Sequence, residues 1–199
     1  MLRAGPRKIR MKAFHITAVM LLGLALLANT PLNYTLDAKS SSVSAKVAFF
    51  GLASKTAGFP TMTGRVTIVP DRPADALIDV TIDARALTAP DKVTLQRLRG
   101  EKFFWVEKYP TVRFRGTRLT MRDATRGTVE GQLTARGVTR PETLSVTFDS
   151  PPTASAANKP IALTGEMVID RRDYGMNAYR LVVGKDVTIR LQARMVPQV

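Results

Sequence analysis

The sequence predicts an all-β domain, an antiparallel eight-stranded barrel with one short helix capping an end, preceded by an N-terminal signal segment. Apolar and polar residues alternate with a period of two over most of the chain after residue 34. The alternating segments are short and turn residues separate them at regular intervals, which is typical of a sandwich or a barrel. Only one segment has helical spacing, so helices cannot cover the edges of an open sheet, and this favours a closed barrel.

Residues 1–28 are predicted to be a signal peptide. Five basic residues and no acidic one lie in its first 12 positions, and an apolar run of 16 residues, 13–28, follows. The run is shorter than the roughly 20 residues that a membrane span needs. Met11 is an alternative translation start, because Lys12 and the apolar run behind it already form a compact signal peptide. We expect export after cleavage, with a retained N-terminal membrane anchor as the alternative.

Composition limits what the exported chain can do. Residues 29–199, which we expect to form a single domain, have a net charge of +9, no Cys and no His, because His15 lies in the signal segment. His-dependent triads, Cys nucleophiles and His/Cys metal sites are therefore excluded, and no nucleotide-binding motif is present. We predict a protein that is not an enzyme and has no metal or cofactor. The basic surface suits anionic lipid headgroups, while export argues against nucleic acid.

Eight strands are predicted, with one further segment as a candidate ninth. One strand changes its pattern midway, because Val112 and Phe114 share a face whereas Leu119 and Met121 have the opposite parity. We interpret this change as a β-bulge at 116–117, the alternative being an inward-pointing Arg118. The predicted strands are 34–39, 43–50, 62–70, 76–84, 111–121, 127–137, 142–149 and 161–170, with 186–195 as the candidate ninth.

One helix is predicted between residues 88 and 100. Thr88 is the expected cap with Asp91 three residues later, and Gly100 ends the helix. The helix leads directly into the stretch Lys102–Gly116, which holds five of the 13 aromatic residues. We expect the helix to form a lid or plug over one end of the barrel.

The aromatic stretch has two interpretations. Its side chains either fill a barrel end or contact an apolar ligand, and an eight-stranded barrel is wide enough for either arrangement. Small residues at expected interior positions would leave room along the axis; these are Ala45, Ala48 or Gly131, Ala135 and Ala193. We therefore expect a cavity. The candidate contacts for an apolar tail are Phe49, Phe103, Phe104, Trp105, Phe114, Phe148 and Leu191.

A pair of neighbouring arginines also has two interpretations. Arg171 and Arg172 precede Asp173, Tyr174 and Gly175 at a predicted strand exit. An Arg beside Asp before a Gly turn is typical of a tethered corner. The alternative is that Arg171 and Arg172 contact the headgroup of a ligand.

Three motifs resemble the YceI-like family of bacterial polyisoprenoid-binding proteins. The helix-to-strand segment from Leu95 to Phe114, with Phe103-Phe104 and Tyr109-Pro110, is similar to one family signature. The segment 131–141, GQLTARGVTRP, resembles the pattern G-x-L-T-x-x-G-V-T-x-P, and 169–175 followed by 183–187 resembles the closing pattern. The likeness spans about residues 34–195. Lys92, Glu142 and Tyr174 depart from the family pattern, and residues 50–63 match it poorly.

The resemblance implies a lipocalin-like barrel in the periplasm that carries a long-chain isoprenoid or another amphiphilic lipid in its bore, such as a polyprenyl phosphate or a quinone tail. It also fits transient contact with a membrane surface. The alternative function is an envelope stress-response or protein-interaction module whose barrel has a solid core.

Overall fold

The computed structural model describes residues 31–69, 72–152 and 159–198, so the predicted signal segment lies outside the described residues. Within these ranges the chain forms ten strands and one α-helix, α1 (Lys92–Arg99). The strands are β1 (Leu32–Leu36), β2 (Ser42–Phe49), β3 (Ala53–Phe59), β4 (Met62–Ile68), β5 (Leu77–Asp83), β6 (Thr111–Met121), β7 (Arg126–Ala135), β8 (Val138–Phe148), β9 (Ile161–Asp170) and β10 (Val183–Pro197). None of the helical segments in the described part of the chain has the length and apolar character required to cross a membrane.

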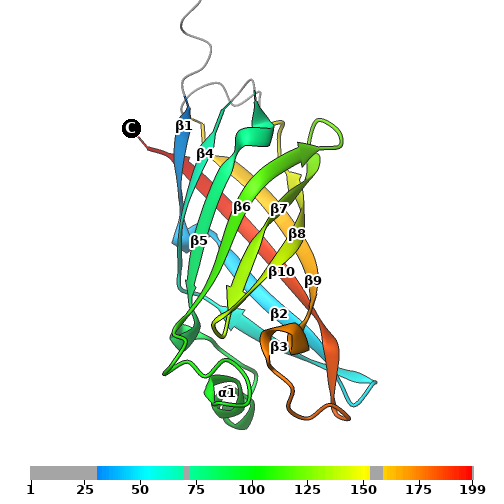
Figure 1. Cartoon of the computed structure of the whole chain (residues 1–199). Helices are drawn as coiled ribbons and strands as arrows, with labels where there is room; N and C mark the ends of the chain where they lie inside the picture. Colours follow the sequence, from blue (N-terminus) through cyan, green and yellow to red (C-terminus); the bar gives the residue numbers. More distant parts are fainter. Residues whose placement is uncertain (1–30, 70–71, 153–158, 199) are drawn as a thin grey trace, which may run out of the picture.

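The strands form a closed antiparallel barrel (Figure 1). The ring runs β1-β4-β5-β6-β7-β8-β9-β10 and closes where Leu36 of β1 pairs with Met195 of β10. β2 pairs with the first part of β10, and β3 pairs with β2. β1 and β2 are thus two parts of one wall strand, as are β3 and β4, so ten strands build an eight-stranded wall. The predicted fold is confirmed.

Three strand predictions need correction. The first strand, expected over 34–39, is β1, which ends at Leu36 because a 3-10 turn, Ala38–Ser40, follows with Asp37 as its N-cap. β3 was not predicted, because its sequence ASKTAGF contains small and polar residues that give little hydrophobic contrast. β8 begins at Val138 rather than at residue 142, directly after a two-residue turn. Both turn residues, Arg136 and Gly137, have positive φ, at 51° and 74°. Such turns match the twist of a hairpin and allow both strands to continue to the turn.

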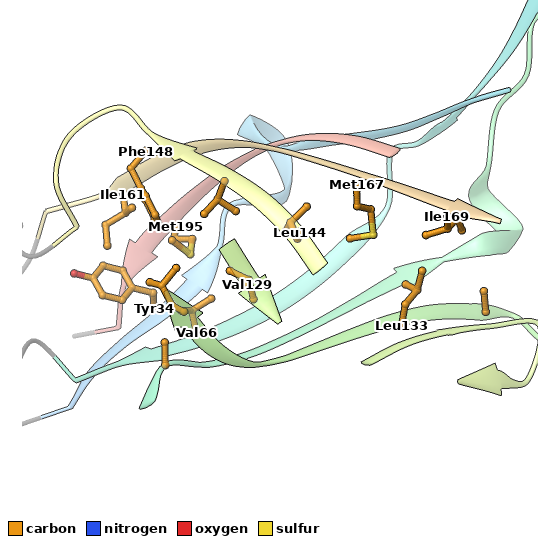
Figure 2. Close-up of a cluster of buried hydrophobic side chains, with 14 of the residues drawn as sticks. Tyr34, Val66, Val129, Leu133, Leu144, Phe148, Ile161, Met167, Ile169 and Met195 are labelled. Atoms are coloured by element: carbon orange, nitrogen blue, oxygen red, sulfur yellow. The ribbon is translucent and has the colours of Figure 1, made fainter. Parts of the chain in front are cut away.

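Alternate residues of each wall strand point into the barrel, as period-two patterning requires. In β7 the buried positions include Val129, Leu133 and Ala135, and the inward side chains of several strands meet in Figure 2. The predicted bulge is confirmed, because the register between β6 and β7 shifts between Gly116 and Arg118. The bulge turns Leu119 into the core and leaves Arg118 on the outer surface.

The wall has two gaps, both at the end of the barrel where α1 lies, called here the α1 end. β8 pairs with β9 only over Ser145–Phe148, and the short 3-10 turn η4 (Arg171–Tyr174) contacts β8 beyond that point. On its outer edge β3 makes a single bridge, between Gly58 and Thr88. Beside β3, α1 and the segment leading to β6 cover the barrel end (Figure 1).

The cap of α1 differs from the prediction. Asp91 is the N-cap, and its Oδ1 accepts a hydrogen bond from the backbone N–H of Thr94 at 2.8 Å. Thr88 is instead bonded through its backbone to Gly58, at 2.9 and 3.0 Å. A carboxylate satisfies a free N–H at a helix start as well as a hydroxyl does. Because the backbone of Thr88 is hydrogen-bonded to β3, Asp91 caps α1 in its place. Gly100 ends the helix as predicted.

Candidate functional site

An apolar cavity of about 240 Å³ extends along the interior of the barrel. Residues of all ten strands line it, from Ile68 and Met195 near one end to Phe103 and Arg171 at the α1 end. The polar residues of the lining, Lys55, Thr56, Thr94 and Arg171, all lie at the α1 end. Such a cavity can bind the apolar body of a ligand along the axis and a polar group at one end.

Five of the seven aromatic and aliphatic residues proposed to contact a ligand line this cavity; they are Phe103, Phe104, Phe114, Phe148 and Leu191. Among the small residues expected to leave room, Ala45, Ala135 and Ala193 line it as well. Ala48 is exposed instead, and a side chain at Gly131 would meet Cζ of Phe114 at 2.8 Å.

Phe49 and Trp105 do not line the cavity. Phe49 lies in the part of the β2–β3 hairpin that extends past the barrel end. There its ring packs edge-on against the ring of Phe50, with 4.7 Å between the ring centroids. Trp105 adopts a positive φ of 47° in the turn after α1. Its ring packs edge-on against the ring of Tyr109, with 5.8 Å between the ring centroids. Nζ of Lys108 lies 4.4 Å from the centroid of the Trp105 ring. The turn conformation therefore directs Trp105 away from the bore.

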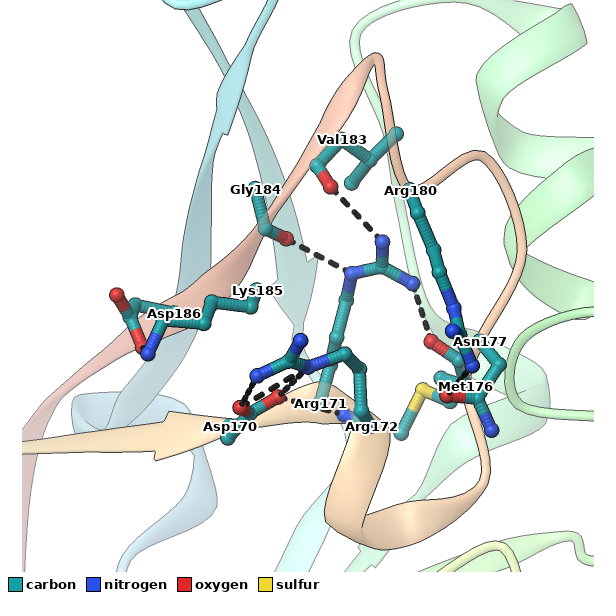
Figure 3. A network of polar contacts seen from close by, with 10 residues as sticks. All are labelled: Asp170, Arg171, Arg172, Met176, Asn177, Arg180, Val183, Gly184, Lys185 and Asp186. Atoms are coloured by element: carbon teal, nitrogen blue, oxygen red, sulfur yellow. Dashed lines mark hydrogen bonds and ion pairs between the residues drawn. The ribbon is translucent and has the colours of Figure 1, made fainter.

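Arg171 reaches the cavity at the α1 end and is only 3% exposed (Figure 3). Its Nε donates to the carbonyl of Gly184 at 2.8 Å and its Nη2 to the carbonyl of Val183 at 2.8 Å, while Nη1 donates to the carbonyl of Met176. No carboxylate of the described residues forms an ion pair with it. Burial lowers the pKa of Arg171. The site thus contains a buried cation that backbone carbonyls hold in place.

Arg172 lies outside the cavity and pairs with Asp170 (Figure 3). Asp170 also accepts a hydrogen bond from the backbone N–H of Arg172 at 2.9 Å, and Gly175 ends the turn with a φ of 73°. The hydrogen bond from the Arg172 side chain is the main reason that the pKa of Asp170 falls to about 2. The tethered corner is therefore present, and the two neighbouring arginines occupy different environments.

The mouth of the cavity contains residues that sequence reasoning missed. Lys55 and Thr56 on β3 and Thr94 on α1 belong to the lining, and Thr56 is exposed to solvent. The Nζ of Lys55 forms an ion pair with Oδ2 of Asp91 at 2.8 Å, which links β3 to α1. The hydrogen bond from Lys55 is the main cause that lowers the pKa of Asp91. Lys55 and Thr56 were missed because the sequence pattern of β3 is weak.

The alternative of a solid barrel core is contradicted by the cavity. Most of the inward side chains surround this space as a lining. The chemistry that the site offers is contact with apolar groups along the bore, with a small set of cationic and hydroxyl groups at the α1 end.

Comparisons with known proteins agree with this architecture. A UPF0312 protein of Vibrio vulnificus is 27% identical over 138 residues, which cover 66% of this chain and 73% of that protein. The crystal structure of BcnA of Burkholderia cenocepacia has a TM-score of 0.71 at 20% identity and covers 80% of this chain and 98% of that one. A polyisoprenoid binding domain from Saccharophagus degradans, implicated in plant cell wall breakdown, has a TM-score of 0.66 at 17% identity, covering 84% and 99%. The family model of the YceI-like domain matches residues 34–195, and the chain therefore belongs to the YceI-like family.

Proposed function

We propose that this chain is a periplasmic, non-enzymatic binding or carrier protein that holds a long-chain isoprenoid, or a similar apolar lipid such as a quinone tail, in the barrel bore. The observation that carries this proposal is the continuous apolar cavity, whose lining is polar only at the α1 end. The similarity to the Saccharophagus degradans domain, which is described as polyisoprenoid-binding, supports the same ligand class.

Apolar contact alone supplies enough free energy for such binding. Each buried CH₂ contributes about 0.8 kcal/mol, whereas association costs about 4–15 kcal/mol. A tail of several isoprene units therefore offsets the cost without any catalytic group. The five lining residues Phe103, Phe104, Phe114, Phe148 and Leu191 are the proposed tail contacts.

The polar end of the ligand is proposed to lie near Arg171. Each Nη of a guanidinium carries two hydrogens, and in Arg171 each Nη donates to one backbone carbonyl. Hydrogens remain for an acceptor inside the cavity. An anionic or strongly polar headgroup there would offset the burial of this cation. Arg172 is committed to Asp170 and is proposed to act on a headgroup only through its charge at the rim.

Identification of the bound lipid is the direct test. The protein is purified from its exported form, and native mass spectrometry is combined with organic extraction. The expected result is a bound species whose extract contains an isoprenoid lipid. A homogeneous mass without any extracted lipid, together with no uptake of added isoprenoids by delipidated protein, would overturn the proposal. N-terminal sequencing of the exported form tests the signal cleavage.

A matched pair of variants shows whether the bore is the binding site. Ala45 lines the cavity, and Ala48 lies exposed on the same strand. Ala45→Phe fills space in the bore and is expected to abolish retention of the isoprenoid, whereas Ala48→Phe retains it. Thermal unfolding checks that both variants fold. Equal retention by the two variants would exclude binding in the bore.

A further inference from the structure

Two adjoining loops at the α1 end expose large apolar side chains. The turn between β2 and β3 carries Phe50 and Leu52, and the segment before β10 carries Leu181. Leu52 and Leu181 are fully exposed, and Phe50 is 65% exposed. A hydrogen bond of 2.8 Å from the N–H of Phe50 to the carbonyl of Val182 joins the loops, which project together beyond the barrel (Figure 1). We call Phe50, Leu52 and Leu181 the apolar tip.

The fold does not account for these side chains. Phe50 has a φ of 51°, a conformation that favours Gly, Asn or Asp and that strains a bulky side chain. Its ring makes an edge-on contact with Phe49 but stays largely in solvent. Leu52 and Leu181 are fully exposed, so they contribute no burial. Large apolar groups in such positions are typical of a surface that meets an apolar partner.

The charges around the tip indicate which partner fits. The segments 46–56 and 176–185, which contain the tip, include four basic residues, Lys46, Lys55, Arg180 and Lys185, and no acidic one. Lys55 pairs with Asp91 and Lys185 with the adjacent Asp186, so Lys46 and Arg180 carry the net positive charge beside the tip. An apolar tip within a basic surround matches the boundary between the acyl chains and the headgroups of an anionic bilayer. A bilayer therefore fits both the shape and the charge of this surface.

The tip also lies next to the cavity mouth. Leu52 is in the hairpin that carries Lys55 and Thr56, and both of these line the cavity. A bilayer that receives Leu52 would face the point at which the cavity reaches the surface. An apolar ligand could then pass between the bilayer and the bore with little exposure to water.

We propose that the apolar tip is a docking site for an anionic membrane surface. Leu52, Leu181 and Phe50 enter the headgroup region, the surrounding basic residues contact the lipid headgroups, and the cavity mouth faces the bilayer. The docking itself is inferred only from the exposed apolar residues and the basic residues beside them. The transfer of a ligand through the mouth rests on the proposed function.

Vesicle flotation tests the docking. Wild-type protein lacking the signal segment is mixed with vesicles of phosphatidylcholine and phosphatidylglycerol, or of phosphatidylcholine alone. We expect flotation with the anionic vesicles that weakens as salt is added. The double variant Leu52→Ser/Leu181→Ser should lower the partition coefficient by at least about tenfold. Because both side chains are fully exposed, the variant should fold as the wild type does, which circular dichroism checks.

Leu77 supplies the matched control. It is 60% exposed at the start of β5, at the opposite end of the barrel (Figure 1). Leu77→Ser should float like the wild type. The proposal is overturned if wild-type protein does not float with anionic vesicles, or if the double variant floats as well as the wild type. Capture of another protein by the tip without flotation would replace the membrane with a protein partner and also overturn it.

A second measurement separates this inference from the proposed function. The rate of isoprenoid transfer from vesicles to protein is compared with the retention of isoprenoid delivered in detergent. The double variant should slow transfer from vesicles and leave detergent-delivered retention unchanged. Wild-type protein that floats but retains no isoprenoid would refute the proposed function and leave the docking intact. Retention with equal transfer rates in both proteins would refute the role of the tip in transfer.

Discussion

The phenol of Tyr174 donates a hydrogen bond to Oε1 of Glu142 at 2.7 Å. Tyr174 is fully buried in η4, and Glu142 lies half-buried on β8. The bond thus joins η4 to β8 at the gap where β8 and β9 no longer pair. Tyr174 supplies the donor of this bond and Glu142 its acceptor.

This contact should appear as a coupling energy. We expect Tyr174→Phe and Glu142→Val each to reduce the free energy of unfolding, and the double variant to lose less than the sum, with a coupling of about 1–2 kcal/mol. Urea unfolding of the four proteins measures the cycle. Strictly additive losses would show that the hydrogen bond contributes nothing to stability.

The same residue predicts a loss of stability at alkaline pH. Burial, and then the hydrogen bond to Glu142, raise the pKa of Tyr174 well above its ordinary value. The stabilisation is fully present below the unfolded phenol's pKa of about 10 and is lost as the pH rises above it, because the unfolded chain then releases a proton that the folded chain retains. The free energy of unfolding should fall more steeply with pH in the wild type than in Tyr174→Phe. Tyr34, whose pKa burial also raises, is present in both proteins. Equal slopes would contradict the prediction.

Arg171 and Arg172 should differ sharply in their effect on stability. Arg171→Met removes the donors of three buried or partly buried hydrogen bonds and is expected to cost about 2–4 kcal/mol. Arg172→Met removes an exposed ion pair with Asp170 and should change the denaturation midpoint little. Arg171→Lys retains the charge but not the planar fork, so it should behave like Arg171→Met. Similar midpoints for Arg171→Met and Arg172→Met would refute the structural role of Arg171.

Substitutions at two glycines, Gly51 and Gly137, should distinguish the stability cost of backbone strain from that of a steric clash. Gly137 and Gly51 have nearly equal φ values, 74° and 71°. A Cβ at Gly137 would lie 2.6 Å from Cε1 of Tyr109, whereas a Cβ at Gly51 would meet nothing within 4 Å. Gly51→Ala should cost about 1–2 kcal/mol through strain alone, and Gly137→Ala about 1–3 kcal/mol more. In a Tyr109→Ala background the excess should disappear, and its persistence there would contradict the steric explanation. Chemical denaturation gives both values.

The ion pair between Lys55 and Asp91 should control the local opening of α1. Asp91→Ser retains an N-cap but loses the ion pair, and Asp91→Ala loses both. Amide hydrogen exchange at Thr94 should therefore accelerate severalfold in Asp91→Ala and less in Asp91→Ser. Acidification should lower the protection factor of this amide, that is, its exchange rate corrected for the slower intrinsic exchange in acid, because the pKa of Asp91 is lowered in the fold and its stabilisation is lost as the pH falls below about 4. Equal exchange rates in both variants would show that the cap is not required.

Sequence patterning failed at particular places for identifiable reasons. β3 was missed because Ala53, Ser54 and Gly58 give no periodic contrast, and its position depends on pairing with β2 and on the bridge to Thr88. That bridge also changed the helix cap from Thr88 to Asp91. The mouth residues on β3 were missed with the strand. In each of these cases the local sequence pattern was weak or misleading, and a contact with a distant segment determined the structure.

By itself, the sequence determined the all-β class, the closed barrel, the bulge near Gly116 and the helix that precedes the aromatic stretch. It could do so because alternation with period two, turn residues and helix stop signals are local properties of the chain. Only the tertiary structure decided that Phe103 and Phe104 enter the bore while Trp105 turns away, and that Arg171 is buried while Arg172 is paired outside. Adjacent residues of the same chemical type, such as Arg171 and Arg172, cannot be told apart by local sequence patterns. Their environments are set by packing between strands far apart in the sequence, and the cavity is the space that this packing leaves unfilled.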